Sequence, residues 1–319
     1  MRRCALFLLL LLLSPALLAQ ESAVPEIRYE SVPNVLQLPP HLYLGEAAGV
    51  ALNSKGHIFV YSRGGHTQLL EFDAEGKFLR TIGDDLYGFV FAHAVRIDKD
   101  DNIWCVDEGS NMVIKFSPEG RVLMVLGRKP ESVEGAAAPG ATRPPRPEWQ
   151  FDRPTDIAFG PNGELYISDG YGNSRVAKYD KDGNLLKSWG KRGTEPGEFN
   201  TPHTIVTDAQ GRVYVGDRGN RRIQVFDGDG NFLKQWTNVG APWAMCITPG
   251  PHPFIYTSDS VPGRIYKLDL NGNVLGVFGK AGKQLGQFGW VHEMECPSEN
   301  VLYVGDLLNW RVQKLLLHP

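Results

Sequence analysis

The chain has 319 residues, with 33 Lys and Arg against 36 Asp and Glu and a formal net charge of −3. This near balance, with a slight acidic excess, argues against nucleic acid or an anionic membrane surface as a partner. The length suits one large all-β domain or two ordinary domains.

The first twenty residues are typical of a secretory signal peptide. Arg2 and Arg3 precede an apolar run over residues 5–18, and small residues follow. A basic start, a short apolar core and a small-residue exit mark a cleavable signal. The run is shorter than the ~20 residues that a membrane span needs, although an uncleaved anchor is the alternative. We therefore expect residues 1–20 to be removed, no membrane span in residues 21–319, and a protein that is secreted or periplasmic.

An internal repeat runs along the rest of the chain. Turn pairs such as Asn162-Gly163 and Asp182-Gly183 separate short β-branched or aromatic runs, and such pairs supply the positive φ of tight hairpin turns. Four short strands per copy, at a period of roughly 40 to 50 residues, predict propeller blades. The fold we expect is all-β, a six-bladed propeller of NHL-type repeats in a single domain; an open β-solenoid is the alternative, but its repeats are shorter. The six copies occupy residues 49–83, 93–127, 155–190, 203–236, 243–279 and 292–319.

Two segments lie outside the repeat. The last copy stops after its third strand, and the strand-like segment Glu26–Val32 is expected to close the ring as the outer strand of the last blade, leaving no open sheet edge. Residues 128–150 are rich in Pro, Ala and Gly, which predicts a long loop between the second and third blades. That loop either lies over one face of the propeller or is a linker without a role.

Three cysteines remain after the signal peptide, Cys105, Cys246 and Cys296. An odd number in an exported chain permits at most one internal bridge. Cys246 and Cys296 fall at similar places in neighbouring repeats, which favours this pair, but the sequence alone leaves the pairing open.

Histidines alternate at one position of the repeat. Alternate blades of a six-fold ring stand about 120° apart, so the three imidazoles are expected to converge on the channel. Three histidines with a fourth position open form the ligand set of a catalytic zinc site, with other metals that bind imidazole as alternatives. A lone histidine here would usually be a hydrogen-bonded core residue, so the prediction depends on the set. The residues that head the first strands of the six copies are Ala48, His93, Thr155, His203, Trp243 and His292.

Charged and phenolic side chains are expected at the same end of the central channel as the histidines. Arg63 and Arg218 end second strands and Tyr171 lies in the corresponding loop, and in antiparallel blades these positions face the first-strand histidines. Two guanidinium groups and a phenol suit the binding of a carboxylate and the movement of a proton. A further set, expected to tie loops to blades, recurs one turn later at Arg175, Arg222, Arg264 and Arg311.

With these residues, the chain resembles the peptidyl-α-hydroxyglycine α-amidating lyase family. The likeness covers essentially the whole mature chain and is densest from Pro154 to Phe226, in "PTDIAFGPNGELYISDGYGNSR", "PGEFNTPHTIV" and "DRGNRRIQVF". The resemblance implies that the three histidines hold zinc. It also implies that Tyr171 is the general base, that Arg218 favours its phenolate form, and that Arg63 binds the substrate carboxylate.

The resemblance implies a second metal site and one substrate contact. A structural calcium ion would take the backbone carbonyls of Val50 and Val95 and the side chain of Glu293, where the family has an aspartate. Trp290 replaces the family's methionine two residues before the last histidine and would line the substrate pocket.

The activity implied is that of a peptidylamidoglycolate lyase, which breaks the C–N bond of a peptidyl-α-hydroxyglycine to give a peptide amide and glyoxylate. No redox cofactor is needed, and a separate monooxygenase is expected to supply the substrate. One alternative is a non-catalytic exported NHL propeller that binds a peptide or protein. Another is a lactonase-like hydrolase, but those sites use carboxylate and amide ligands around calcium rather than histidines.

Overall fold

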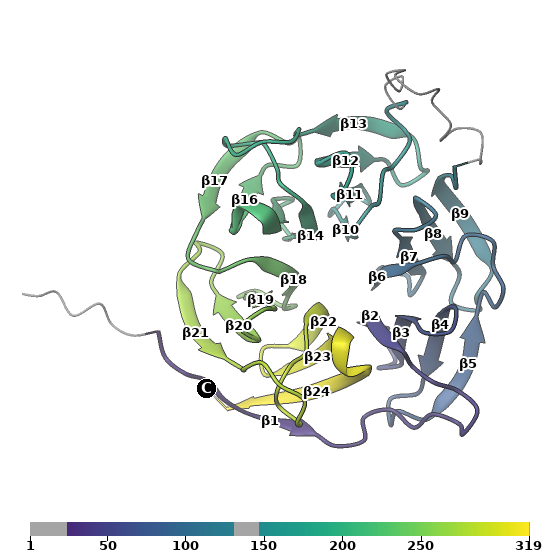
Figure 1. The fold of residues 1–319 in the computed structure, drawn as a ribbon. Coiled ribbons are helices and arrows are strands. Elements are labelled where there is room, and N and C mark those ends of the chain that lie inside the picture. Colours follow the sequence, from purple (N-terminus) through teal and green to yellow (C-terminus); the bar gives the residue numbers. More distant parts are fainter. Residues whose placement is uncertain (1–23, 131–146, 319) are drawn as a thin grey trace, which may run out of the picture.

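The computed structural model describes residues 24–130 and 147–318. The described residues form six four-stranded antiparallel sheets arranged as blades around a central channel, with the first strand of each blade innermost (Figure 1). The prediction of a six-bladed β-propeller is therefore confirmed. The predicted signal peptide and most of the predicted loop over 128–150 lie outside the described residues.

The strands follow the repeat. The first blade contains β2 (Glu46–Leu52), β3 (Ile58–Arg63), β4 (Thr67–Phe72) and β5 (Phe78–Ile82). The second contains β6 (Ala92–Ile97), β7 (Ile103–Asp107), β8 (Met112–Phe116) and β9 (Val122–Gly127). The third contains β10 (Asp156–Phe159), β11 (Leu165–Asp169), β12 (Arg175–Tyr179) and β13 (Leu185–Trp189).

The fourth blade contains β14 (Pro202–Thr207), β15 (Val213–Asp217), β16 (Arg222–Phe226) and β17 (Phe232–Trp236). The fifth contains β18 (Pro242–Ile247), β19 (Ile255–Asp259), β20 (Arg264–Leu268) and β21 (Val274–Phe278). The sixth contains β22 (Val291–Ser298), β23 (Val301–Asp306), β24 (Arg311–His318) and β1 (Arg28–Val32). Short 3₁₀ turns, η2 (Arg218–Asn220) and η3 (Leu307–Asn309), follow the second strands of the fourth and sixth blades.

The turns that connect the strands use the predicted chemistry. Between β12 and β13, one carboxylate oxygen of Asp180 accepts the backbone N–H groups of Asp182 and Asn184, and Gly183 takes a φ of 84°. A side chain with a Cβ is strained at such a φ, whereas glycine adopts it freely. These local bonds fix where each hairpin reverses, and so they set the strand register across the blade.

The sixth blade is closed by the two ends of the described chain. β1 pairs antiparallel with β24, from Arg28 opposite His318 to Val32 opposite Lys314 (Figure 1). The predicted outer strand is therefore present, although it begins at Arg28, and Glu26 instead forms an isolated bridge with Val277 of the fifth blade. This pairing leaves no unpaired edge on β24.

Arginines at the starts of third strands hold loops to blades, as predicted. Arg175, Arg222 and Arg311 each donate to a buried aspartate at the end of the preceding strand, at distances of 3.0, 2.8 and 2.9 Å. Arg264 instead donates to the carbonyl of Gly279, in the loop that follows β21, and to Glu26. Arg264 therefore ties the N-terminal segment to the fifth blade.

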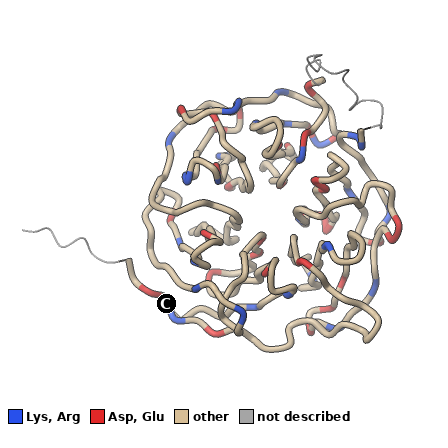
Figure 2. Tube along the Cα trace, in the orientation of Figure 1, with Lys and Arg blue, Asp and Glu red and all other residues tan. Residues whose placement is uncertain are grey.

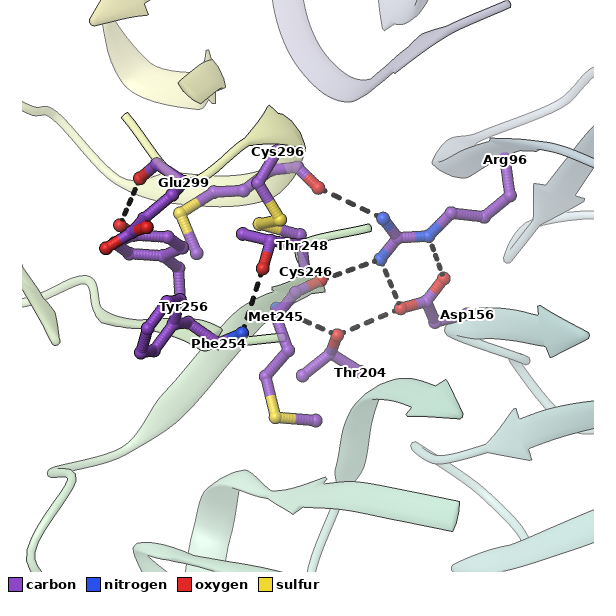
Figure 3. The surroundings of a disulfide bond; sticks show 11 residues. Arg96, Asp156, Thr204, Met245, Cys246, Thr248, Phe254, Tyr256, Cys296 and Glu299 are labelled. Atoms are coloured by element: carbon purple, nitrogen blue, oxygen red, sulfur yellow. Dashed lines mark hydrogen bonds and ion pairs between the residues drawn. A yellow bond between two sulfur atoms is a disulfide. The ribbon is translucent and has the colours of Figure 1, made fainter. Parts of the chain in front are cut away.

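A disulfide joins Cys246 of β18 to Cys296 of β22, the pair that the sequence favoured (Figure 3). The bridge links the inner strands of the fifth and sixth blades. Among the described cysteines, Cys105 is free and buried. Within the described ranges, no helix is long and apolar enough to span a bilayer.

The core lies between neighbouring blades. Buried Trp104 and Val106 of the second blade share one apolar cluster with Ile157 and Ile167 of the third. Lys and Arg positions and Asp and Glu positions are both scattered around the ring (Figure 2). Packing between blades therefore holds the inner strands, which carry the site described next.

Candidate metal centre

The three histidines that the sequence singled out are residues of β-bulges. His93 is skipped in the pairing of β6 with β7, because Ala92 lies opposite Asp107 and Ala94 lies opposite Val106. His203 and His292 are skipped in the same way in the fourth and sixth blades. A bulge re-aims a side chain that regular pairing would direct elsewhere. The sequence placed these histidines at the heads of strands but gave no sign of the bulges.

The imidazoles converge at one mouth of the channel. The ring centroid of His93 lies 4.6 Å from that of His292 and 4.7 Å from that of His203. The ring centroids of His203 and His292 are 5.1 Å apart. One nitrogen from each ring lies within 4.8 Å of the others, and all three residues are buried. Three buried nitrogens this close together could hold one metal ion.

Backbone carbonyls set the protonation of each ring. Nδ1 of His93, His203 and His292 lies 2.6, 2.6 and 2.8 Å from a carbonyl oxygen. A carbonyl only accepts, so each Nδ1 carries the proton and each Nε2 presents its lone pair to the centre. Hydrogen bonds of this kind orient metal-binding histidines and make them better ligands.

The carbonyls come from the same position of the repeat in the intervening blades. Thr155 accepts from His93, Trp243 accepts from His203, and Ala48 accepts from His292. Histidine and acceptor therefore alternate around the channel, one from each blade. The alignment of the six copies contained this pattern, but only the structure shows that the odd-numbered blades take part.

Burial lowers the pKa of all three histidines. The nearby charge of Arg218 lowers all three further, and that of Arg63 lowers the pKa of His93 and His292. For His292 the pKa falls to about 3. The imidazoles are thus neutral at physiological pH, which is the form that binds metal. Zinc fits this donor set, and copper, iron and nickel also accept imidazole, so the residues fit a metal without fixing its identity.

Tyr171 reaches the same centre from the turn between β11 and β12. Its Oη lies 3.1 Å from Nε2 of His203 and 3.4 Å from Nε2 of His93. Arg218 donates from Nη1 to the same Oη at 3.3 Å, and its guanidinium stacks 4.3 Å above the Trp243 ring. The structure therefore brings Tyr171 and Arg218 together with the histidines.

Burial is the largest influence on Tyr171 and raises its pKa. Arg218 and Arg63 lower the pKa and Glu108 raises it, so the net direction is upward. The contribution of Arg218 has the sign that the sequence led us to expect, but it is smaller than the effect of burial. The Tyr171 phenol is therefore protonated, beside histidines that are neutral.

Arg63 lies beside the centre rather than in it. Its Nε lies 2.8 Å from a carboxylate oxygen of Glu46, and its guanidinium stacks 3.9 Å above the ring of Phe91. Arg63 also lines a cavity of about 430 Å³ that is walled in part by Tyr43 and Trp310. Because its charge lowers the pKa of His93 and His292, Arg63 is close to both the cavity and the histidines.

Trp290 lies at the rim of the centre. Its indole is centred 4.9 Å from that of Trp243, which itself lies 5.3 Å from His203. The pair of indoles forms an apolar wall on one side of the histidines, where the predicted substrate contact was placed.

The residues predicted for calcium lie together but do not fit that ion. Backbone N–H groups of Val50 and Val95 each donate to Oε2 of Glu293 at 3.0 Å. The other oxygen of Glu293 lies 3.1 Å from Nε of Arg96. Calcium takes oxygen ligands, whereas N–H donors and a guanidinium repel it. Calcium therefore has no place in the function proposed below.

Comparisons with known proteins place these features in a family. A family model described as NHL repeat matches residues 151–179 and 199–226. The chain is 30% identical over 308 residues to peptidyl-glycine alpha-amidating monooxygenase B of Xenopus laevis, covering 83% of this chain and 33% of that protein. It is 29% identical over 203 residues to a probable peptidyl-alpha-hydroxyglycine alpha-amidating lyase of Caenorhabditis elegans, covering 56% of this chain and 55% of that protein. The chain belongs to the peptidyl-α-hydroxyglycine α-amidating lyase family.

The chain spans about a third of the length of the Xenopus relative and about half of the Caenorhabditis relative. The lyase names of its family support a lyase-like role. Among solved structures, virginiamycin B lyase from Staphylococcus aureus superposes with a TM-score of 0.62 at 13% identity, over 92% of this chain and 100% of that one. At that identity the likeness shows the fold alone.

Proposed function

We propose that this chain is a zinc-dependent carbon–nitrogen lyase that converts a peptidyl-α-hydroxyglycine-type substrate into a peptide amide and glyoxylate. One observation carries the proposal: Tyr171 Oη lies within hydrogen-bond distance of two Nε2 atoms that present lone pairs to a common centre. A proton-transfer group thus adjoins a metal-binding set. The lyase names of the relatives support the same reaction class.

The reaction needs one proton to leave an oxygen and one to reach a nitrogen. Loss of the hydroxyl proton lets that O–H electron pair form the C=O bond of glyoxylate. The C–N bond then breaks with its electron pair on nitrogen, and protonation of the nitrogen completes the amide. No electron is gained or lost overall. Zinc held by His93, His203 and His292 would supply a Lewis acid that lowers the pKa of a bound hydroxyl.

Tyr171 is the group placed to move the proton. To act as the base, Tyr171 must first lose its own proton to solvent; Arg218, which donates to its Oη at 3.3 Å, and a zinc cation held by the histidines would both favour the phenolate. Because burial raises the pKa of Tyr171, the phenolate is a strong base, and the phenol that it becomes can return the same proton to the leaving nitrogen. One side chain can therefore act first as the base and then as the acid.

Arg63 is assigned to the substrate carboxylate. The guanidinium has further N–H donors besides the Nε that faces Glu46, and a planar fork matches a carboxylate. The adjoining cavity of about 430 Å³, with Tyr43, Phe91 and Trp310 in its wall, has room for an acyl or peptidyl group. Trp290 and Trp243 would wall the opposite side.

Replacing Arg63 with methionine is expected to raise KM for an N-acyl-α-hydroxyglycine about 10- to 100-fold, with a smaller change in kcat. A charged hydrogen bond of this type is worth about 1.5–3 kcal/mol, and methionine keeps the contact with Phe91. Steady-state kinetics measures the change. An N-acyl carbinolamide that lacks the carboxylate is the control substrate, and an equal defect on both substrates would contradict the assignment.

Localisation and supply follow from the same proposal. The signal-like N-terminus supports action outside the cytoplasm, in a periplasm or in the extracellular medium. The substrate would come from an enzyme class that hydroxylates the α-carbon of a C-terminal glycine, which is a monooxygenase reaction.

The proposal is tested by incubating the purified zinc-loaded protein with N-benzoyl-α-hydroxyglycine and measuring both products. We expect glyoxylate and benzamide to appear in equal amounts, faster than in buffer that contains the same zinc. Release at the rate of the buffer would refute the lyase function and favour a propeller that only binds a peptide or protein.

A further inference from the structure

A buried charged cluster lies in the channel beneath the histidines. Arg96 donates from Nε and Nη2 to the two carboxylate oxygens of Asp156, at 3.0 and 2.8 Å (Figure 3). The second carboxylate is that of Glu293, with Oε1 3.1 Å from Nε of Arg96. Arg96 is 8% exposed, and each of the two acids is 2% exposed. Charges this deep are retained only when partners replace the lost water.

Backbone oxygens complete the surroundings of the guanidinium. Arg96 donates from Nη1 to the carbonyl of Met294 at 3.0 Å and from Nη2 to the carbonyl of Met245 at 3.2 Å. Figure 3 shows the side chain reaching across the channel toward the strands that the disulfide joins. Two carboxylates and two carbonyls thus face one positive group. That oxygen set is of the kind that a calcium ion takes.

The cluster joins all six blades. Glu293 holds the first and second through the N–H groups of Val50 and Val95. Thr204 Oγ1 donates to Asp156 at 2.9 Å and accepts the N–H of Met245 at 3.1 Å, which adds the fourth and fifth. The inner strands and their members are β2 with Val50, β6 with Arg96, β10 with Asp156, β14 with Thr204, β18 with Met245 and β22 with Glu293.

These residues lie next in sequence to the groups that form the metal centre. Thr204 follows His203, and Glu293 follows His292. Asp156 follows Thr155, whose carbonyl accepts from His93. The cluster therefore fixes the backbone from which each imidazole is aimed.

Arg96 also separates the two ends of the channel. It lines the space around the three histidines, and it lines a cavity of about 190 Å³ together with Ile157, Ile205 and Glu295. The guanidinium thus stands between the metal centre and this second cavity.

We propose that the Arg96 guanidinium is the built-in cation of this channel, paired with the acid that the family resemblance assigned to calcium, and that it is a positioning residue for the histidines. The role of Arg96 as the cation of the channel depends only on the oxygen atoms around it. Its role in positioning the histidines also rests on the metal centre of the proposed function.

The proposal predicts that removing Arg96 creates a need for calcium. The Arg96→Ala variant leaves Asp156, Glu293 and two carbonyls around a hole, so millimolar calcium should bind there. Without calcium, we expect its Tm to fall and its zinc affinity to drop about 10- to 100-fold, as for lost outer-shell partners. Calcium should restore both, and magnesium, which demands stricter geometry, should restore less. The wild-type Tm should not respond to calcium.

The measurements are thermal unfolding and zinc competition with a chromophoric chelator, each with calcium, with magnesium and with neither. Arg222→Ala is the matched control, because Arg222 is also buried and paired with an aspartate at 2.8 Å but lies on β16. It should lower the Tm without a calcium response and leave zinc affinity unchanged.

Two results would overturn the proposal: a wild-type Tm that rises with calcium, or an Arg96→Ala variant that keeps full zinc affinity without it. If the alanine variant aggregates in every buffer, Arg96→Lys decides, because lysine keeps the charge but loses the fork. If the Tm of Arg96→Lys does not respond to calcium and its zinc affinity stays within about tenfold of wild type, the proposal is supported. A larger loss of zinc affinity, or a Tm that rises with calcium, opposes it. Neither readout needs turnover, so failure of the lyase function remains a separate result.

Discussion

Replacing His203 with alanine is expected to abolish stoichiometric metal binding and to reduce glyoxylate release to the rate of buffer. The substitution removes one of three Nε2 donors and leaves a two-histidine site that is open on one side. Loss of an outer-shell partner typically weakens metal affinity 10- to 100-fold, and loss of a direct ligand should weaken it more. Elemental analysis after dialysis measures the metal, and product assay measures the rate.

The matched control is His252→Ala, because His252 is exposed and lies outside the centre. It should keep both metal and activity. Circular dichroism checks that the His203 variant still folds, which we expect because the blade core of the fourth repeat is untouched. A folded His203→Ala variant with one metal per chain would show that the histidines are not the metal ligands.

Replacing Tyr171 with phenylalanine is expected to lower kcat about 10²- to 10⁴-fold while leaving metal content unchanged. The change removes only the hydroxyl that lies 3.1 Å from His203 Nε2 and accepts from Arg218. Losses of that size are typical when a positioned acid or base is removed. The phenylalanine ring keeps the packing of tyrosine, so KM should change little. Steady-state kinetics on zinc-loaded protein separates the two parameters.

Tyr179→Phe is the control for this change. Tyr179 belongs to the same blade, and its hydroxyl is buried without a hydrogen-bond partner, so its removal should leave kcat unchanged. Full activity in the Tyr171 variant would exclude the phenol as the proton-transfer group. Equal loss in both variants would point to a general effect on the third blade.

The parts of the fold that repeat in sequence were the parts that could be predicted. Turn pairs such as Asp182-Gly183 form hydrogen bonds with residues next to them in sequence, so the residue types determine the turn geometry. The six copies also placed His93, His203 and His292 in one column, and ring symmetry then brings them together. The closing strand could be predicted because β24 would otherwise leave an edge unpaired.

The remaining features of the fold and the site depend on contacts between distant residues, which the sequence pattern does not show. A bulge at His93 is a matter of register between two strands, and its sequence resembles that of a regular strand. Arg96 could not be recognised as the channel's cation, because its partners Asp156 and Glu293 are 60 and 197 residues away. The calcium expectation followed Glu293 from the family pattern, and only the packed channel shows that a guanidinium already meets that acid. Arg264 likewise matched its column but found another partner in the N-terminal segment.

The alternation of histidine and carbonyl around the channel has a consequence for the order of assembly. His292 belongs to the last blade, and its Nδ1 donates to Ala48 of the first, 244 residues earlier. A chain still being synthesised therefore lacks both the third imidazole and the contact that orients it. Any metal that the three histidines take together would therefore bind only after the final blade has docked and the ring is closed. A chain exported unfolded would acquire its metal in the compartment where it folds, from the supply available there.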